Sequence, residues 1–160
     1  MDNILALLTP KNQLVYLEHN MTLRQAIEKM RVHRFTVIPV INGETGVYIG
    51  SVAEGDLLYN LIKEETISIR DLEDKNVTDI IRPRFMPAMK VDTSLKELVD
   101  LITIQNYVPI VDDRGILMGI VTRKSAMKYL IEKIEENSWF LLKNKSWLLI
   151  INEHKCFLSR

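Results

Sequence analysis

The chain has 160 residues, 47% of them hydrophobic, enough for one compact domain or for two similar halves that share a core. Lysine and arginine total 21, as do aspartate and glutamate, so the formal net charge is zero, which argues against bulk nucleic-acid binding through a basic surface. The single cysteine, Cys156, excludes an internal disulfide and fits a reducing compartment.

The amino terminus, MDNILALLTP, carries an acidic residue and no basic region, unlike a secretory signal. The longest late apolar run, WLLII at 147–151, is far too short to span a bilayer. We therefore expect a cytoplasmic protein with no membrane association.

One pattern occurs twice along the chain. FTVIPVINGETGVYIGSV contains Pro39 and Gly50, and NYVPIVDDRGILMGIV contains Pro109 and Gly119, so the offsets are 109 − 39 = 70 and 119 − 50 = 69. Upstream, NMTLRQAIEKM matches DTSLKELVDLI. The repeat covers most of the chain up to about residue 136, and it predicts two structurally equivalent halves.

Each copy predicts the order strand, helix, strand, strand, helix. The first helix of each copy begins at a capping box, formed by Thr22 with Gln25 and by Ser94 with Glu97. Apolar residues then recur at helical spacing and predict one buried stripe on each helix: Leu23, Ala26, Ile27 and Met30, and Leu95, Leu98, Val99 and Ile102. The short runs FTVIPVI and YVPIV predict buried strands, each followed by a hairpin turn and a second strand.

The pattern divides the chain into residues 1–64, a charged linker at 65–76, residues 77–136 and an apolar tail at 137–160. The tail carries both tryptophans and could form a hairpin or continue the last helix. It could pack on its own module or form an interface, and we favour an interface because large apolar patches seldom face water.

A three-stranded sheet covered by helices on one face leaves its other face apolar. Two such halves placed face to face would cover each other, which predicts an α/β fold with pseudo-twofold symmetry and two equivalent clefts. The halves differ in one spacing: Met30 to Pro39 spans nine positions and Ile102 to Pro109 spans seven.

The stretches VIPVINGETGVYIGSVAEGDLL and YVPIVDDRGILMGIVTRKSAM resemble the tandem CBS (cystathionine β-synthase) domain pair, or Bateman module, of the stand-alone bacterial type. The family pattern is an apolar strand with proline and valine, a turn, then Gly-apolar-apolar-Thr-x-x-Asp at the start of a helix. Each copy departs from it: the first has Ala53 for the threonine, and the second has Ser125 for the aspartate.

The resemblance implies a regulatory module that binds an adenosine derivative such as AMP, ADP, ATP, S-adenosylmethionine or cyclic di-AMP. Each cleft would combine the purine wall of one repeat with the phosphate corner of the other. The favoured cleft would contain Lys11, Gln13, Thr36, Val37, Ile38, Pro39, Thr122, Arg123, Lys124 and Ser125. The second, weaker cleft would contain Asp56, which accepts ribose hydroxyls in the family, with Tyr107, Val108 and Pro109.

Thr122 could also be an ordinary helix cap, and we favour ligand binding. Basic residues at a helix N-terminus oppose the helix dipole, so a nearby anion explains Arg123 and Lys124 better than solvent does. The favoured cleft lacks the ribose carboxylate, and a cyclic dinucleotide, whose 3′ oxygen is esterified, needs that carboxylate less than AMP or ATP does.

We therefore expect a regulatory adenine-nucleotide sensor that acts on a partner protein, forms a homodimer and is not an enzyme. No nucleophile lies beside a base in a recognisable motif, and the three histidines are too scattered for a metal site, so we expect no obligatory cofactor. The alternatives are a cyclic di-AMP receptor of the same fold and a ligand-free interaction module. A nucleic-acid binder is a third reading, against which the zero net charge counts.

Overall fold

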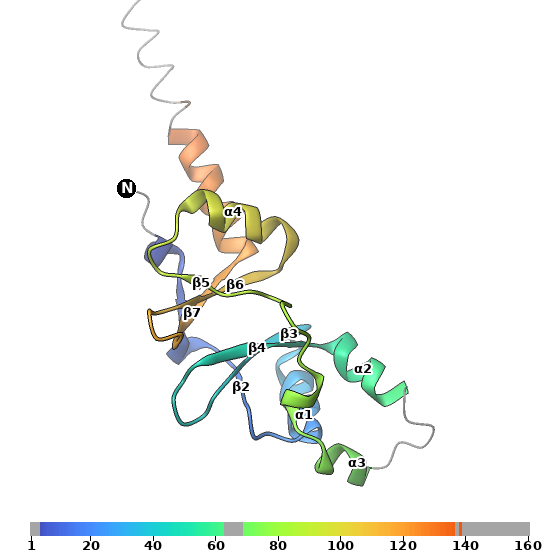
Figure 1. Cartoon of the computed structure of the whole chain (residues 1–160). Coiled ribbons are helices and arrows are strands. Elements are labelled where there is room, and N and C mark those ends of the chain that lie inside the picture. Colours follow the sequence, from blue (N-terminus) through green and yellow to red (C-terminus); the bar gives the residue numbers. More distant parts are fainter. Residues whose placement is uncertain (1–3, 63–68, 137, 139–160) are drawn as a thin grey trace, which may run out of the picture. The chain divides into compact units, whose positions relative to one another are not determined.

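The computed structural model describes residues 4–62, 69–136 and 138. The chain divides into two compact units, residues 1–123 and residues 124–160. The first unit contains four described α-helices, labelled in Figure 1: α1 (Leu23–His33), α2 (Glu54–Ile62), α3 (Ile69–Asp74) and α4 (Leu95–Ile104). It also contains short 3₁₀ helices, η1 (Ile4–Leu7), η2 (Lys11–Gln13) and η3 (Val77–Ile80).

The strands form two sheets. The first has the order β2-β3-β4 and the second the order β1-β7-β6-β5. The strands run β1 (Thr9–Pro10), β2 (Leu17–Glu18), β3 (Val37–Ile41), β4 (Tyr48–Ala53), β5 (Met89–Lys90), β6 (Tyr107–Val111) and β7 (Leu117–Thr122). The predicted α/β class with two repeated halves is confirmed, since β2-β3-β4 and β5-β6-β7 each join one parallel and one antiparallel pair.

Both predicted capping boxes are present. The Thr22 hydroxyl accepts from the backbone N–H of Gln25, and the Gln25 side chain accepts from the N–H of Thr22. Ser94 and Glu97 form the same reciprocal pair at the start of α4. These bonds satisfy donors that a helix leaves unpaired, which is why both helices begin where the sequence predicts.

The core of the first repeat lies between its helices and one face of its sheet. Leu23, Ala26 and Met30 of α1 are buried with Ile38 and Val40 of β3. Because side chains alternate across a strand, Val37 and Pro39 fall on the opposite face, toward the first cleft described below.

The strand β1 departs from the predicted three-stranded sheets. It lies at the start of the first repeat but pairs antiparallel with β7 of the second, with Thr9 opposite Ile120 and Pro10 opposite Gly119. Gly119 permits this pairing because a Cβ there would overlap the carbonyl oxygen of Thr9. The second sheet therefore has four strands and the first has three.

The segment expected to be a linker, 65–76, contains the helix α3, which lies against α1 (Figure 1). Arg24 of α1 forms an ion pair with Glu73, and the Leu72 side chain packs against the core of the first repeat. Arg70, Glu73 and Asp74 of α3 are exposed.

In the second unit, residues 124–136 are helical. Met127, Ile131 and Ile134 recur along this helix and are each at least half exposed. The predicted apolar tail, 137–160, lies outside the described residues except for position 138.

Candidate functional site

A cleft of about 420 Å³ lies within the first unit and draws its walls from both repeats. Its polar lining residues are Thr9, Gln13, Arg34, Thr36, Asn106, Tyr107 and Thr122. Its apolar lining residues are Leu14, Val15, Phe35, Val37, Pro39 and Ile120. The volume lies in the range of small-molecule sites, and apolar walls with several polar groups are typical of them.

This first cleft brings together five of the residues predicted for the favoured site. Gln13, Thr36, Val37 and Pro39 come from the first repeat, and Thr122 comes from the last position of β7 in the second. Thr36, Val37 and Pro39 of one repeat therefore line one cavity with Thr122 of the other.

Two predicted residues lie elsewhere. Ile38 is fully buried in the core on the other face of β3, because it alternates with Val37 and Pro39. The Lys11 ammonium lies 5.5 Å from the centre of the Tyr16 ring and does not line the cleft.

Arg123 also lies outside the lining, and its guanidinium has protein partners. Its Nε donates to the carbonyl of Ile102 and one terminal nitrogen donates to the carbonyl of Gln105, each at 3.0 Å. These carbonyls lie at the C-terminus of α4, where the helix dipole favours a cation. This contact accounts for the position of Arg123 without the anion that the sequence analysis invoked.

Lys124 and Ser125, also predicted for the favoured site, begin the second compact unit. The lining of the first cleft consists entirely of residues of the first unit.

The sequence analysis missed Arg34 and Phe35. Arg34 follows α1 in the left-handed conformation, with φ 54°, and its N–H donates to the carbonyl of Met30. It is the one charged residue in the lining, and within the described residues its guanidinium has no hydrogen bond or ion pair. The longer spacing from Met30 to Pro39 was the available signal, since this longer connection carries the two residues.

A row of three hydrogen-bonded hydroxyl groups, those of Tyr107, Ser51 and Tyr48, starts at this cleft. The Tyr48 hydroxyl donates to the carbonyl of Met86 at 2.8 Å, so the 2.8 Å bond between Tyr48 and Ser51 must have Ser51 as its donor. The Ser51 hydrogen is then committed, and Tyr107 must donate in the 2.7 Å bond between Tyr107 and Ser51. The Tyr107 oxygen is left as an acceptor at the cleft.

Burial raises the pKa of Tyr48 to about 12, against a smaller lowering by its hydrogen bond to Ser51. Burial also raises the pKa of Tyr107, opposed by Ser51 and reinforced by the nearby Tyr48. Both phenols are therefore neutral donors in the folded protein at any ordinary pH.

At its other end, the row of hydrogen-bonded hydroxyls reaches Tyr48, which lines a second region of cavities in the first unit. One cavity of about 400 Å³ is lined by Tyr48 and by residues 81–87, and one of about 320 Å³ is lined by Asp56 and residues 79–83. Arg84 and Met86 in this segment have positive φ angles of 60° and 54°. Such conformations are strained for residues other than glycine and often occur at functional sites.

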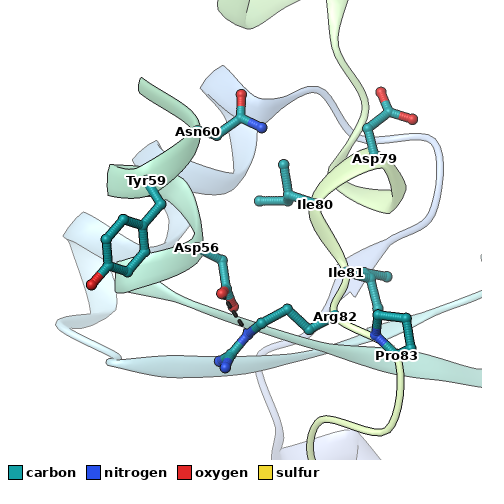
Figure 2. Close-up of a pocket in the computed structure, with 8 residues that line it drawn as sticks. All are labelled: Asp56, Tyr59, Asn60, Asp79, Ile80, Ile81, Arg82 and Pro83. Carbon is teal, nitrogen blue, oxygen red and sulfur yellow. Dashed lines mark ion pairs between the residues drawn. The ribbon is translucent and has the colours of Figure 1, made fainter. Parts of the chain in front are cut away.

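Asp56 lies in the smaller cavity, in the first turn of α2 (Figure 2). One carboxylate oxygen accepts from the backbone N–H of Ala53 at 2.9 Å, and the other accepts from Nε of Arg82 at 2.7 Å. Of the residues predicted to accompany Asp56, Val108 and Pro109 are buried in β6, and Tyr107 lines the first cleft. The structure does not bring these residues together around Asp56.

No group of three or more histidine, cysteine, aspartate or glutamate side chains suited to a metal ion occurs within residues 4–62, 69–136 and 138. Over the same described positions, none of the helices is both long and apolar enough to cross a bilayer.

Comparison with known proteins places these features in a family. Solved structures with a similar fold include CbpB in complex with c-di-AMP, with a TM-score of 0.77, 16% identity and coverage of 86% of this chain and 89% of that one. CBSX2 in complex with AMP is also similar, with a TM-score of 0.66, 24% identity and coverage of 82% and 98%.

Among curated proteins, the chain is 23% identical over 135 residues to the uncharacterized protein MJ1225 of Methanocaldococcus jannaschii, covering 72% of this chain and 45% of that protein. The chain spans about half the length of the curated relatives it matches. The CBS domain model matches twice, at residues 6–63 and 77–132, which together make up most of the chain. The chain therefore belongs to the CBS domain family and carries two copies of the domain.

Proposed function

We propose that this chain is a regulatory module that binds an adenine nucleotide in the first cleft and transmits its occupancy to a partner protein. The observation that carries the proposal is the cleft itself, in which Thr36, Val37 and Pro39 of one repeat share a cavity with Thr122 of the other. Fold neighbours of this chain have been solved with c-di-AMP and with AMP, which supports the same ligand class.

The chemistry of the lining fits a purine with a phosphate. Val37, Pro39 and Ile120 offer apolar surface to the flat faces of a base. Arg34 supplies a positive charge without a partner among the described residues, and its planar donors suit a phosphate. Thr122 offers a hydroxyl at the end of β7.

The lining contains no carboxylate, and this favours a second candidate ligand. A nucleotide with a free ribose diol gains from a carboxylate that accepts both hydroxyls, whereas a cyclic dinucleotide has its 3′ oxygen esterified. We therefore include cyclic di-AMP as the alternative ligand of the same cleft.

Calorimetric titration with AMP, ADP, ATP, S-adenosylmethionine and cyclic di-AMP tests the proposal. We expect at least one ligand to bind and to raise the melting temperature, because a ligand at one hundred times its Kd stabilises the folded state by about 2.7 kcal/mol. If none binds, the chain is a ligand-free interaction module and the sensor proposal is wrong.

We also propose that the module forms a homodimer. Leu58, Tyr59 and Ile62 of α2 are each more than half exposed, as are Met127, Ile131 and Ile134 of the helix at 124–136. Each helix thus presents an apolar face that association would remove from water. Sedimentation velocity across a concentration series tests this proposal, and a monomer at all concentrations would contradict it.

A further inference from the structure

The carboxylate of Asp56 has both of its oxygens committed within the chain. Oδ2 caps α2 by accepting from the N–H of Ala53, and Oδ1 accepts from Nε of Arg82. The Asp56 side chain is only 8% exposed, so little of it is open to water. Oδ1 is therefore the oxygen that an incoming ligand would have to take over from Arg82.

Arg82 has two contacts that hold it at this position. Its Nε lies 2.7 Å from a carboxylate oxygen of Asp56 (Figure 2), and its guanidinium carbon lies 3.7 Å from the centre of the Phe85 ring. A guanidinium over an aromatic face is attracted to the ring, so the two contacts support each other. The pair joins the first repeat, through Asp56, to the segment that opens the second.

A carboxylate is an acceptor-only group, and its partners are donors such as a guanidinium or a pair of neighbouring hydroxyls. A ribose offers two hydroxyl donors from adjacent carbons. Nε of Arg82 already donates to Oδ1, so Arg82 and a ribose would compete for the same atom of Asp56.

The first cleft and the cavity at Asp56 also differ in the charged residues that line them. The first cleft has Arg34 and no carboxylate, whereas the cavity at Asp56 is lined by Asp56, Asp79 and Arg82. Asp79 caps η3 by accepting from the N–H of Asn76 at 2.9 Å. Without the Arg82 charge, two carboxylates would remain, and they would repel a phosphate but not a neutral nucleoside.

We propose that Arg82 is an in-chain occupant of the position at Asp56 that a ribose diol would take, so that it determines which ligands the second region can bind. With Arg82 in place, the Asp56 cavity excludes ribonucleosides. Without it, the cavity accepts an uncharged ribonucleoside through its diol. The conclusion that each chain then binds nucleotide in the first cleft alone rests on the proposed function.

The test counts bound adenosine per chain by equilibrium dialysis, for the wild type and for Arg82→Met, which keeps an aliphatic side chain but removes the donors. Arg84→Met is the matched control, because it removes the same charge two residues away without touching Asp56. In a third protein, Arg82→Met is combined with Asp56→Asn, since an asparagine oxygen can still accept from the N–H of Ala53. Arg82→Ala repeats the first change should the methionine variant fold poorly, as judged by circular dichroism.

We expect the Arg82 variants to bind one adenosine more per chain than the wild type, and to lose that gain with 2′,3′-dideoxyadenosine or with Asp56→Asn. Arg84→Met should match the wild type. Equal binding by the wild type and the Arg82 variants would overturn the proposal, as would a gain that persists with the dideoxy compound. The proposed function is judged separately, by whether the wild type binds a phosphate-bearing ligand, so either idea can fail alone.

Discussion

The hydroxyl oxygens of Ser51 and Tyr107 lie 2.7 Å apart, although 56 residues separate them in the chain. Ser51 belongs to β4 and Tyr107 to β6, so this bond joins the sheets of the two repeats. Ser51 is fully buried and also forms a hydrogen bond with the Tyr48 hydroxyl, which donates to the carbonyl of Met86. A polar network of this kind is stable only while each hydroxyl keeps its partner.

Alkaline pH should destabilise the protein through Tyr48. Burial raises the pKa of Tyr48 from 10.0 to about 12 in the folded state. Between these two pH values the folded state therefore keeps a proton that the unfolded state loses. The contribution is fully present below pH 10 and is lost as the pH rises toward about 12. Urea denaturation from pH 8 to 12 should show the free energy of unfolding falling over this range.

Tyr48→Phe is the variant that checks the assignment to this phenol. It removes the ionisable group and keeps the ring, so its stability should fall less steeply above pH 10 than that of the wild type. A fall of the same slope would show that other groups cause the alkaline loss, with Tyr107 as the first to test in the same way.

Arg34→Gln should weaken binding of a phosphate-bearing ligand to the first cleft. Hydrogen bonds to a charged group contribute about 1.5–3 kcal/mol, which corresponds to a loss of about ten- to one-hundred-fold in affinity. Titration calorimetry measures this effect. Arg31→Gln is the control, because Arg31 lies in the last turn of α1, three residues before Arg34, contacts Glu28 and does not line the cleft. Equal losses in both variants would mean that only net charge matters.

Arg123→Met should reduce stability rather than ligand affinity. The substitution removes two bonds to carbonyls at the end of α4, and we expect a loss of about 1–2 kcal/mol in the free energy of unfolding. Lys124→Met removes the same charge at the next position and should cost less. Chemical denaturation compares the two, and a large loss of affinity in Arg123→Met with unchanged stability would restore the phosphate-binding interpretation.

Gly119→Ala should be more damaging than Gly50→Ala, although the two glycines are equivalent in the repeat. A Cβ at 119 would overlap the backbone oxygen of Thr9 and lie 2.9 Å from the Leu8 side chain. A Cβ at 50 would meet the side chain of Ile81 at 2.6 Å, and a side chain can move more readily than a strand backbone. Melting temperatures of the two variants test the order, and an equal or reversed order would contradict it.

Much of the fold could be predicted because it depends on local patterns. Thr22 with Gln25 predicted the start of α1, and helical spacing predicted the burial of Leu23, Ala26 and Met30. These two features follow from neighbouring residues. That the 36–39 strand and Thr122 share a cleft was implied by the family resemblance, and Thr36, Val37, Pro39 and Thr122 line one cavity.

The features that could not be predicted depend on segments that approach from a distance. The acceptors of Arg123 lie 18 and 21 residues away, and nothing near Asp56 in the sequence indicates Arg82. Equivalent sequences also adopt different structures. LLTPKNQLVYL of the first repeat resembles IIRPRFMPAMKV of the second, yet Thr9 and Pro10 form a strand with β7, whereas the second segment contains Arg84 and Met86 at positive φ. Strand pairing of this kind is decided by the assembled halves.

The pairing of β1 with β7 also governs how the chain can be divided. A fragment that starts at Val77 would contain a whole sequence repeat but would lack the strand that covers β7. An uncovered strand presents unpaired backbone groups that recruit other chains, so such a fragment is expected to aggregate. Cutting between the repeats would therefore leave the second one with an open sheet edge, and the boundary between them in the sequence is not a boundary between independent folding units.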